Sequence, residues 1–280
     1  MSGLTIGAAL RQAGALIGRV DARVLMCHVL ACGTSYLIAH DDRPLDAKQT
    51  AAFDALVQGR CQGRPVAYLV GHREFYGREF LVNESVLIPR PETELIVDLA
   101  RQLYPEGAAR VLDLGTGSGA LAVTLSREWP EADVVGVDAS VPALDVAKAN
   151  SQRLGAQVRF CESDWFSALS DEPPFDLIMS NPPYIRESDP HLAAGDVRFE
   201  PTSALVGGRD GLADIARICA DAPAHLHADG WLLFEHGYDQ AGDVRSLLAT
   251  GPFRDIQSWR DIARIERVTG GRLDAALAQA

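Results

Sequence analysis

The chain has 280 residues, of which 47% are apolar, so it is long enough to build one or two globular domains. It has no uncharged apolar run near the ~18 residues of a membrane span, and its N-terminus, soon interrupted by Arg11, lacks the layout of a signal peptide. Residues 1–90 carry 10 basic and 8 acidic side chains and residues 91–280 carry 16 and 30, an acidic excess that disfavours a nucleic-acid substrate. Because neither a membrane span nor a signal peptide is predicted, we expect a cytoplasmic protein, and we expect it to be a monomer.

The first 72 residues are expected to form a small helical domain. Apolar side chains recur every three or four residues over 4–70, as in amphipathic helices, and Ser35 and Asp46 are candidate N-caps. Cys27, Cys32 and nearby histidines follow this pattern without a second ligand pair, which favours packing over a zinc site. The five cysteines are odd in number and have no framework spacing, so we expect free thiols.

A hairpin and a proline-rich turn are predicted next. Residues 74–82 place aromatic and branched side chains on both sides of Gly77, which is typical of a β-hairpin. Pro91 suits the first turn of a helix that runs to about Leu103. We therefore expect residues 73–90 to be a hairpin linker and residues 91–280 to be a catalytic domain.

From Arg110 onward, strand and helix patterns alternate. Strands are expected at 111–114, 133–138, 158–161, 176–180, 231–235, 253–259 and 264–268, and helices at 118–128, 140–154, 211–222 and 239–249. Such alternation indicates an α/β fold with a doubly wound, Rossmann-like sheet.

A glycine-rich segment joins the first of these strands to the next helix. It reads Asp113, Leu114, Gly115, Thr116, Gly117, Ser118, Gly119. Glycine lets the backbone approach a ligand closely, and the helix N-terminus beyond it supplies free N–H groups. Asp138 ends the second strand, 19 residues past Gly119, where a carboxylate can accept both hydroxyls of a ribose.

Two cofactors fit this segment. Residues 117–122 satisfy the dinucleotide pattern G-x-G-x-x-A, so NAD is a live alternative. S-adenosylmethionine is favoured because Asp113 stands at the strand end, where a carboxylate can meet an amino-acid moiety rather than a pyrophosphate. The chain also offers no obvious hydride-transfer partner. After the third strand, Asp164 is expected to accept from an adenine amino group and Trp165 to pack on the ring.

The fourth strand runs into a stiff polar loop, Asn181-Pro182-Pro183-Tyr184. Its prolines remove two backbone donors and favour extended neighbours, so the loop carbonyls can face a ligand. The Asn181 side-chain oxygen and the Pro182 carbonyl can accept both N–H bonds of a planar amide or amino group, and Tyr184 can stack on its plane. We interpret residues 181–184 as the catalytic and substrate-binding loop, with Asn181 also beside the cofactor.

Together these segments resemble the HemK family, the release factor glutamine methyltransferases, over nearly the whole chain. The most specific part is Ile88–Glu94, which is similar to the family's interdomain signature. Further segments that resemble the family are 64–69, 74–77, 199–201, 204–205, 208–212, 235–237 and 264–268.

The resemblance implies a class I methyltransferase whose helical domain helps to dock a protein substrate. The implied reaction moves a methyl group from S-adenosyl-L-methionine to N5 of the glutamine in the Gly-Gly-Gln motif of peptide chain release factors. S-adenosyl-L-homocysteine is the product, and translation termination is modulated. Arg90 and Glu92 of the signature are then expected to bind substrate, whereas Glu235 and His236 are expected to be structural.

Three other functions stay open. A nucleic-acid amino methyltransferase would use the same loop, but the chain lacks a basic stripe. A cofactor-binding adaptor would have no need of an intact Asn181–Tyr184 loop. An NAD oxidoreductase would be revealed by the cofactor that raises its melting temperature.

Overall fold

The computed structural model describes residues 4–274 and 276, which divide into two compact units. The first unit comprises the chain up to His72 together with Ala194–Phe199, and the second comprises Arg73–Ala193 and the chain from Glu200 onward. The hairpin that we expected to be a linker lies in the second unit. Among the described residues, no helix is both long enough and apolar enough to span a membrane.

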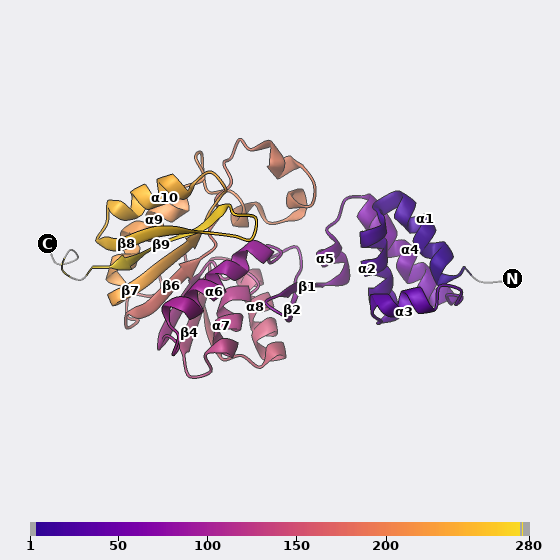
Figure 1. The fold of residues 1–280 in the computed structure, drawn as a ribbon, viewed down its shortest axis with the longest axis horizontal. Helices are drawn as coiled ribbons and strands as arrows, with labels where there is room; N and C mark the ends of the chain where they lie inside the picture. Colours follow the sequence, from indigo (N-terminus) through magenta and orange to yellow (C-terminus); the bar gives the residue numbers. More distant parts are fainter. Residues whose placement is uncertain (1–3, 275, 277–280) are drawn as a thin grey trace. The chain divides into compact units, whose positions relative to one another are not determined.

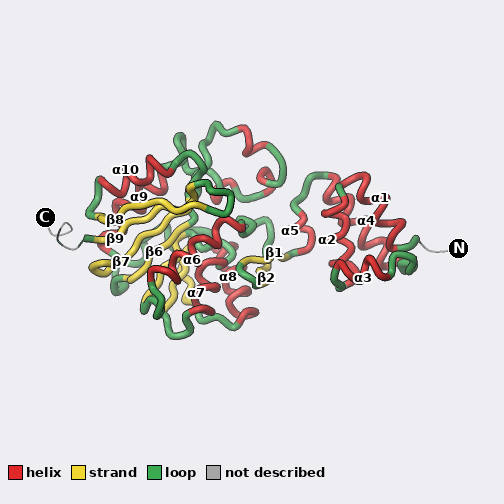
Figure 2. Tube along the Cα trace, viewed as in Figure 1, coloured by secondary structure: helices red, strands yellow, loops and turns green. Residues whose placement is uncertain are grey.

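The first unit is a helical bundle (Figure 2). Its helices are α1 (Ile6–Ile17), α2 (Arg19–Leu30), α3 (Thr34–Ala39), α4 (Ala47–Cys61) and α5 (Val66–Val70). Asp46 caps α4 through a capping box with Gln49, as predicted. The Ser35 prediction was wrong: α3 begins at Thr34 with Gly33 as its N-cap, so Ser35 lies inside the first turn.

A short segment from far along the chain completes this unit. Arg60 of α4 donates to Asp21 of α2 at 2.7 Å and to Asp196 at 2.6 Å. Arg198 donates to the Gln62 carbonyl at 3.1 Å. Residues 194–199 therefore belong to the helical bundle by charge-assisted hydrogen bonds, although the chain on both sides of them belongs to the second unit.

The second unit contains a seven-stranded sheet with the order β5-β4-β3-β6-β7-β9-β8 (Figures 1 and 2). The strands are β3 (Arg110–Leu114), β4 (Asp133–Asp138), β5 (Val158–Glu162), β6 (Phe175–Ser180), β7 (Leu226–Glu235), β8 (Phe253–Arg260) and β9 (Glu266–Leu273). The strands from β5 to β7 pair in parallel, and β9 pairs antiparallel with both β7 and β8. The predicted α/β, Rossmann-like sheet is confirmed.

Helices cover both faces of this sheet. They are α6 (Glu94–Leu103), α7 (Ala120–Glu128), α8 (Val141–Leu154), α9 (Ala213–Asp221) and α10 (Ala241–Ala249), with a 3-10 turn, η1 (Pro91–Thr93), before α6. Successive strand residues point to opposite faces: Val111 joins a core with α6 and α7, whereas Leu112 joins a core with α9 and α10. Both side chains are fully buried.

The hairpin of β1 (His72–Phe75) and β2 (Arg78–Leu81) packs onto the first of these two cores. Phe75 and Phe80 form an edge-to-face pair with ring centroids 6.0 Å apart, and both are almost completely buried. Aromatic rings in this arrangement stabilise the pair beyond simple area burial. The hairpin is therefore fixed beside the parallel strands, whose carboxyl ends meet at one edge of the sheet, where ligands of such folds bind.

Candidate functional site

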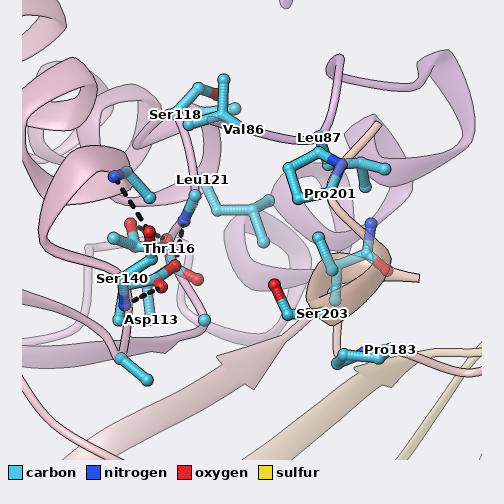
Figure 3. Close-up of a pocket in the computed structure, with 18 of the residues that line it drawn as sticks. Val86, Leu87, Asp113, Thr116, Ser118, Leu121, Ser140, Pro183, Pro201 and Ser203 are labelled. Carbon is cyan, nitrogen blue, oxygen red and sulfur yellow. Dashed lines mark hydrogen bonds between the residues drawn. The ribbon is translucent and has the colours of Figure 1, made fainter. Parts of the chain in front are cut away.

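A cavity of about 380 Å³ lies at the carboxyl ends of the parallel strands. Figure 3 shows Asp113, Thr116 and Ser140 on one side of it and Pro183, Pro201 and Ser203 on the other. Its lining includes these predicted site residues: Arg90, Asp113, Gly115, Thr116, Gly117, Ser118, Asp138, Asp164, Trp165, Asn181 and Pro183. Gly119, Glu92, Pro182 and Tyr184 are not part of the lining.

Residues 115–118 of the glycine segment line the cavity. Gly115, Gly117 and Gly119 have φ angles of 69°, 54° and 79°, a region in which side chains are strained. The Thr116 amide donates to the Val137 carbonyl at 2.8 Å, which ties the segment to the end of β4. These three positions therefore require glycine for the turn itself.

Asp113 is the second-last residue of β3 and is 1% exposed. Its Oδ2 accepts from the Thr116 hydroxyl at 2.7 Å and from the Ala122 amide at 3.1 Å. Its Oδ1 has no hydrogen-bond partner among the described residues. Burial raises the pKa of Asp113 to about 7. A buried carboxyl with one unpaired oxygen on a cavity wall fits a cationic ligand group such as an ammonium.

Asp138 lies on the neighbouring strand end. Its Oδ1 accepts from the Ser140 amide at 2.8 Å and its Oδ2 from the Gly117 amide at 2.9 Å. These bonds orient the carboxylate, while burial raises its pKa. Each carboxylate oxygen can accept a further bond, so Asp138 can bind a pair of ligand hydroxyls.

The next part of the lining joins the end of β5 to α9. Trp165 Nε1 donates to Asp214 at 3.2 Å, and Asp164 accepts from Arg217 at 2.9 Å. A Cβ on Gly115 would lie 3.4 Å from the Trp165 ring. The indole therefore lies against the glycine segment and is oriented by the Asp214 carboxylate, 49 residues further along the chain.

The loop after β6 faces the same cavity through Asn181 and Pro183. Asn181 Nδ2 donates to the Thr93 hydroxyl at 3.2 Å. Its Oδ1 accepts no hydrogen bond from the described residues. The Pro182 carbonyl, in the same stretch, also accepts none from them. The Asn181 oxygen is thus available to a donor-bearing group in the cavity, whereas the Pro182 carbonyl belongs to a buried residue outside the lining.

Tyr184 differs from the expectation that its ring stacks on a bound amide. Its ring packs against the core formed with α9 and α10, and its hydroxyl donates to Glu235 Oε1 at 3.2 Å. Burial raises the pKa of Tyr184. The side chain therefore lies outside the cavity lining because it is held by a buried carboxyl at the end of β7.

Glu235 and His236 are both buried, at 2% and 0% exposure. Burial raises the pKa of Glu235 to about 7 and lowers the pKa of His236. His236 contacts Thr269 at 2.7 Å through Nε2 and the Gly237 carbonyl at 2.9 Å through Nδ1. The imidazole thus ties β7 to β9.

Arg90 lines the cavity and forms an ion pair in which one nitrogen contacts both carboxylate oxygens. Its Nη2 donates to the two Glu200 oxygens at 2.6 and 2.8 Å. The Glu200 side chain has no exposed surface, whereas that of Arg90 is 30% exposed. Glu92 is exposed and lies outside the lining. Arg90 therefore joins the turn at Pro91–Thr93 to the segment that follows the Asn181–Tyr184 loop.

That segment also approaches the loop backbone to backbone. A Cβ on Gly207 would lie 2.3 Å from the Pro183 carbonyl oxygen, and one on Gly211 would lie 2.2 Å from the Tyr184 carbonyl oxygen. The Ile185 amide donates to the Leu205 carbonyl at 2.8 Å. The glycines thus permit a close contact that fixes the position of the loop.

Known protein families and curated relatives match residues in both units of the chain. The PrmC N-terminal domain family matches residues 5–71, and the methyltransferase small domain family matches residues 93–200. The chain is 49% identical to the release factor glutamine methyltransferase of Bordetella pertussis, over 91% of this chain and 95% of that protein. It is 50% identical to that of Burkholderia pseudomallei and 42% identical to that of Escherichia coli, again over 91% of this chain and 92% of each relative.

The chain belongs to the release factor glutamine methyltransferase family. The resemblance identified from Ile88–Glu94 and the two loops is thereby confirmed. A methyltransferase of Pyrococcus furiosus shares the fold with a TM-score of 0.55 and 15% identity, over 79% of this chain and 98% of that one. A 16S rRNA N2 G1207 methyltransferase of T. thermophilus, solved with AdoMet and guanosine, also shares the fold. Its TM-score is 0.51 and its identity 24%, over 72% of this chain and 49% of that one.

Several side chains of this family member's site were not predicted from the sequence. They are Thr93, Ser140, Glu200, Ser203, Asp214 and Arg217. Thr93 directly follows Glu92, and Ser140 is an N-cap two residues after Asp138. Both lie next to predicted site residues, so local spacing could have indicated them. The helix α9 carries Asp214 and Arg217, and no local pattern connects it to the end of β5.

Substitution of Gly207 with alanine is expected to lower methyl transfer by about tenfold or more, because the new Cβ must displace the Pro183 carbonyl and the loop with it. Steady-state methylation measures this effect. Gly242→Ala is the matched control: it lies in α10, where a Cβ meets only the tip of Arg245 at 3.9 Å, and should retain full activity. Equal activity of the two variants would contradict the role of the close contact.

Proposed function

We propose that this chain transfers a methyl group from S-adenosyl-L-methionine to N5 of the glutamine in the Gly-Gly-Gln motif of peptide chain release factors, and so modulates translation termination. One juxtaposition supports this most directly. The Asn181 side chain borders the same cavity as the buried Asp113 carboxyl, whose Oδ1 is unpaired among the described residues. A donor-bearing amide and a cationic cofactor can therefore meet in one space.

The lining fits the parts of the cofactor. Asp113 Oδ1 would take the ammonium group of the methionine moiety, and Asp138 would take the ribose hydroxyls. Trp165 would pack on the adenine ring, with Asp164 near its amino group. The backbone from Gly115 to Gly119 would lie along the ligand. When bound, S-adenosylmethionine supplies an electrophilic methyl group on a sulfonium, with S-adenosylhomocysteine as the leaving product.

The loop would prepare a poor nucleophile, because the lone pair of an amide nitrogen is delocalised into its carbonyl. Asn181 Oδ1 and the Pro182 carbonyl accept the two amide N–H bonds, which orients the nitrogen and favours positive charge on it. The nitrogen lone pair forms the new N–C bond as the C–S bond breaks with its electrons left on sulfur, and one proton leaves the nitrogen. Positioning of this kind can supply much of the reduction in barrier.

The remaining assignments concern the partner. The helical unit is proposed to dock the release factor, with Arg90 and Glu92 beside the glutamine-bearing segment. Arg90 would act through its pair with Glu200. The acidic charge of residues 91–280 supports a protein substrate rather than nucleic acid. We further propose that the chain works as a cytoplasmic monomer.

One experiment tests the proposal as a whole. The protein is incubated with S-adenosylmethionine and a release factor, and the added methyl group is mapped by peptide mass. We expect a single methyl on the Gly-Gly-Gln glutamine and none on a release factor with glutamate at that position. A methyl elsewhere, or none, would overturn the substrate assignment. NAD is expected to leave the melting temperature unchanged, whereas S-adenosylhomocysteine should raise it.

Asp138→Ala is expected to weaken cofactor binding by about 10- to 100-fold while the fold stays intact, because charge-assisted hydrogen bonds to the ribose are lost. Calorimetric titration with S-adenosylhomocysteine measures the change. Asp145→Ala on the exposed face of α8 is the matched control and should bind as the unmodified protein does. An unchanged dissociation constant for Asp138→Ala would remove the ribose role.

A further inference from the structure

The Trp165 side chain is held by one carboxylate from a distant helix. Its Nε1 donates to Asp214 Oδ1 at 3.2 Å, and both residues line the cavity. A Cβ on Gly115 would lie 3.4 Å from the indole, so the ring also borders the glycine segment. Nε1 is the only hydrogen-bond donor of an indole. The Trp165 ring therefore contacts both α9 and the glycine segment, and its one polar atom is already engaged by Asp214.

The backbone of Trp165 adopts an unusual conformation. Its φ angle is 52°, in the left-handed region that bulky residues rarely adopt. The Ser163 hydroxyl donates to the Trp165 carbonyl at 2.8 Å and accepts from the Ala168 amide at 3.1 Å. Such a conformation persists where its surroundings hold it, and it is found more often at ligand sites than elsewhere. The local hydrogen bonds fix the turn, and Asp214 fixes the direction of the indole.

Asp214 is itself fixed by the packing of α9. It lies in the first turn of this helix, and the neighbouring Ile215 and Ile218 are fully buried in the core. The Ala213 amide donates to the Gly207 carbonyl at 3.1 Å, which anchors the start of the helix. The carboxylate is therefore a preorganised acceptor, so a ligand does not have to order it.

A second contact between the same two segments contributes less. Arg217, also on α9, donates to Asp164 at 2.9 Å. Their side chains are 52% and 60% exposed, and ion pairs that are this open to water stabilise a structure little. Asp214 and Trp165 are both partly buried, so water competes less for their hydrogen bond. The contact between Asp214 and Trp165 is therefore the one that determines the position of this wall of the cavity.

We propose that Asp214 is a positioning residue for the adenine base of S-adenosylmethionine, because it holds the Trp165 indole where the base packs. The inference rests on the placement of adenine beside Trp165 in the proposed function. Asp214 acts through Trp165 and has no part in the exchange of bonds. Its effect is on affinity, because a ring that is already oriented loses little side-chain freedom when the base binds.

The test compares ligands with and without the base. Asp214→Ala is expected to raise the Kd for S-adenosylhomocysteine about 5- to 10-fold, as for the loss of one hydrogen bond. S-ribosylhomocysteine keeps the ribose and the amino-acid part without adenine, so its Kd should stay within about twofold. Asp214→Asn keeps an oxygen that accepts from the indole and should bind S-adenosylhomocysteine within about threefold of the unmodified protein. Asp243→Ala is the matched control, since Asp243 is an exposed residue in the first turn of α10, a helix of the same length.

Three further measurements separate positioning from a general effect on the fold. Trp165→Phe removes the N–H donor, and in that background Asp214→Ala should change the Kd for S-adenosylhomocysteine by less than about twofold, since both changes remove one hydrogen bond. In nitrogen-15-labelled protein, the indole N–H signal that Trp165→Phe deletes should exchange faster in Asp214→Ala and keep its rate in Asp214→Asn. In turnover assays of Asp214→Ala, the KM for S-adenosylmethionine should rise as the Kd does, while kcat stays within about twofold.

Three results would overturn the inference. They are a Kd for S-adenosylhomocysteine within about twofold of normal in Asp214→Ala, an equal loss of affinity for S-ribosylhomocysteine, or the same loss in the Trp165→Phe background. The second would indicate a general effect on the fold, and the third would show that Asp214 acts without Trp165. Failure of the proposed function looks different: the release factor glutamine then stays unmethylated, while ligand binding and indole exchange still decide the role of Asp214.

Discussion

Asn181→Ala is expected to lower the rate of methyl transfer by about 100- to 1,000-fold while it leaves cofactor affinity within about twofold. The side chain supplies one of two oxygens that would orient the amide, and loss of a single preorganised group of this kind typically has such an effect. The Asn181 nitrogen is already engaged by Thr93, so the substitution removes an acceptor that faces the cavity rather than a core contact. Single-turnover methylation and calorimetry on the same preparation separate the two quantities.

A different result would contradict the role of Asn181 as an acceptor for the substrate amide. If Asn181→Ala lost cofactor affinity and transfer to the same degree, the side chain would be a cofactor contact and the amide cradle would fail. A release factor without the target glutamine provides the baseline for the methylation assay. The unaltered Pro182 carbonyl should sustain the residual transfer, because a backbone acceptor is not removed by side-chain substitution.

Asp113→Asn is expected to weaken cofactor binding by about 10- to 100-fold, because the asparagine side chain has no charge to pair with an ammonium group. The asparagine oxygen can still accept from Thr116 and Ala122, so its nitrogen would occupy the place of the unpaired Oδ1. The new N–H groups would then face the ligand cation. Calorimetry measures the loss, and Asp145→Asn on the exposed face of α8 is the matched control.

The same carboxyl predicts a dependence on pH. Asp113 has a pKa of about 7 in the folded protein, and an ammonium group needs the ionised form. Affinity should therefore be level above pH 7 and be ~10-fold weaker at pH 6. Asp113→Asn should bind independently of pH in this range. A slope that persists in Asp113→Asn would assign the titration to another group.

The free energy of unfolding depends on pH in the opposite direction from cofactor affinity. The unfolded carboxyl ionises near its ordinary pKa, whereas the folded one keeps its proton up to about pH 7. Between these values the folded state binds more protons, so the contribution of Asp113 to the free energy of unfolding falls as pH rises. The cofactor-free protein should thus gain stability from Asp113→Asn at pH 8, although it loses affinity.

The strands and the two loops could be predicted because their signals are local. The apolar run before Asn181 and the glycines after Asp113 specify strand, turn and helix start within a few residues of each other. The N-cap at Asp46 could be predicted because N-capping is a local signal, and the structure shows that its partner Gln49 is only three residues away. Ser35 was misjudged because Thr34 is an equally acceptable first residue, and packing of the helix decides such a boundary.

The contacts that were missed connect residues far apart in the chain. Arg90 and Glu200 are separated by 110 positions, and Asn181 and Thr93 by 88. Their hydrogen bonds depend on how η1 and the ends of β6 and β7 come together, which no periodicity encodes. Tyr184 shows what sequence alone does not predict. Its aromatic ring suggests stacking on a ligand, and only the position of Glu235 shows that its hydroxyl already donates a hydrogen bond to a buried carboxyl.

The passage of residues 194–199 into the helical unit has a practical consequence for anyone who dissects this chain. A gene fragment that ends at His72 lacks six residues of its own bundle, among them Asp196, one of the two carboxylates that pair with Arg60. The complementary fragment carries these six residues, between the Asn181–Tyr184 loop and Glu200, without the helices that they contact. The two units are therefore folded portions of one interleaved polypeptide, and separation of the halves at the hairpin gives neither half its full complement of contacts.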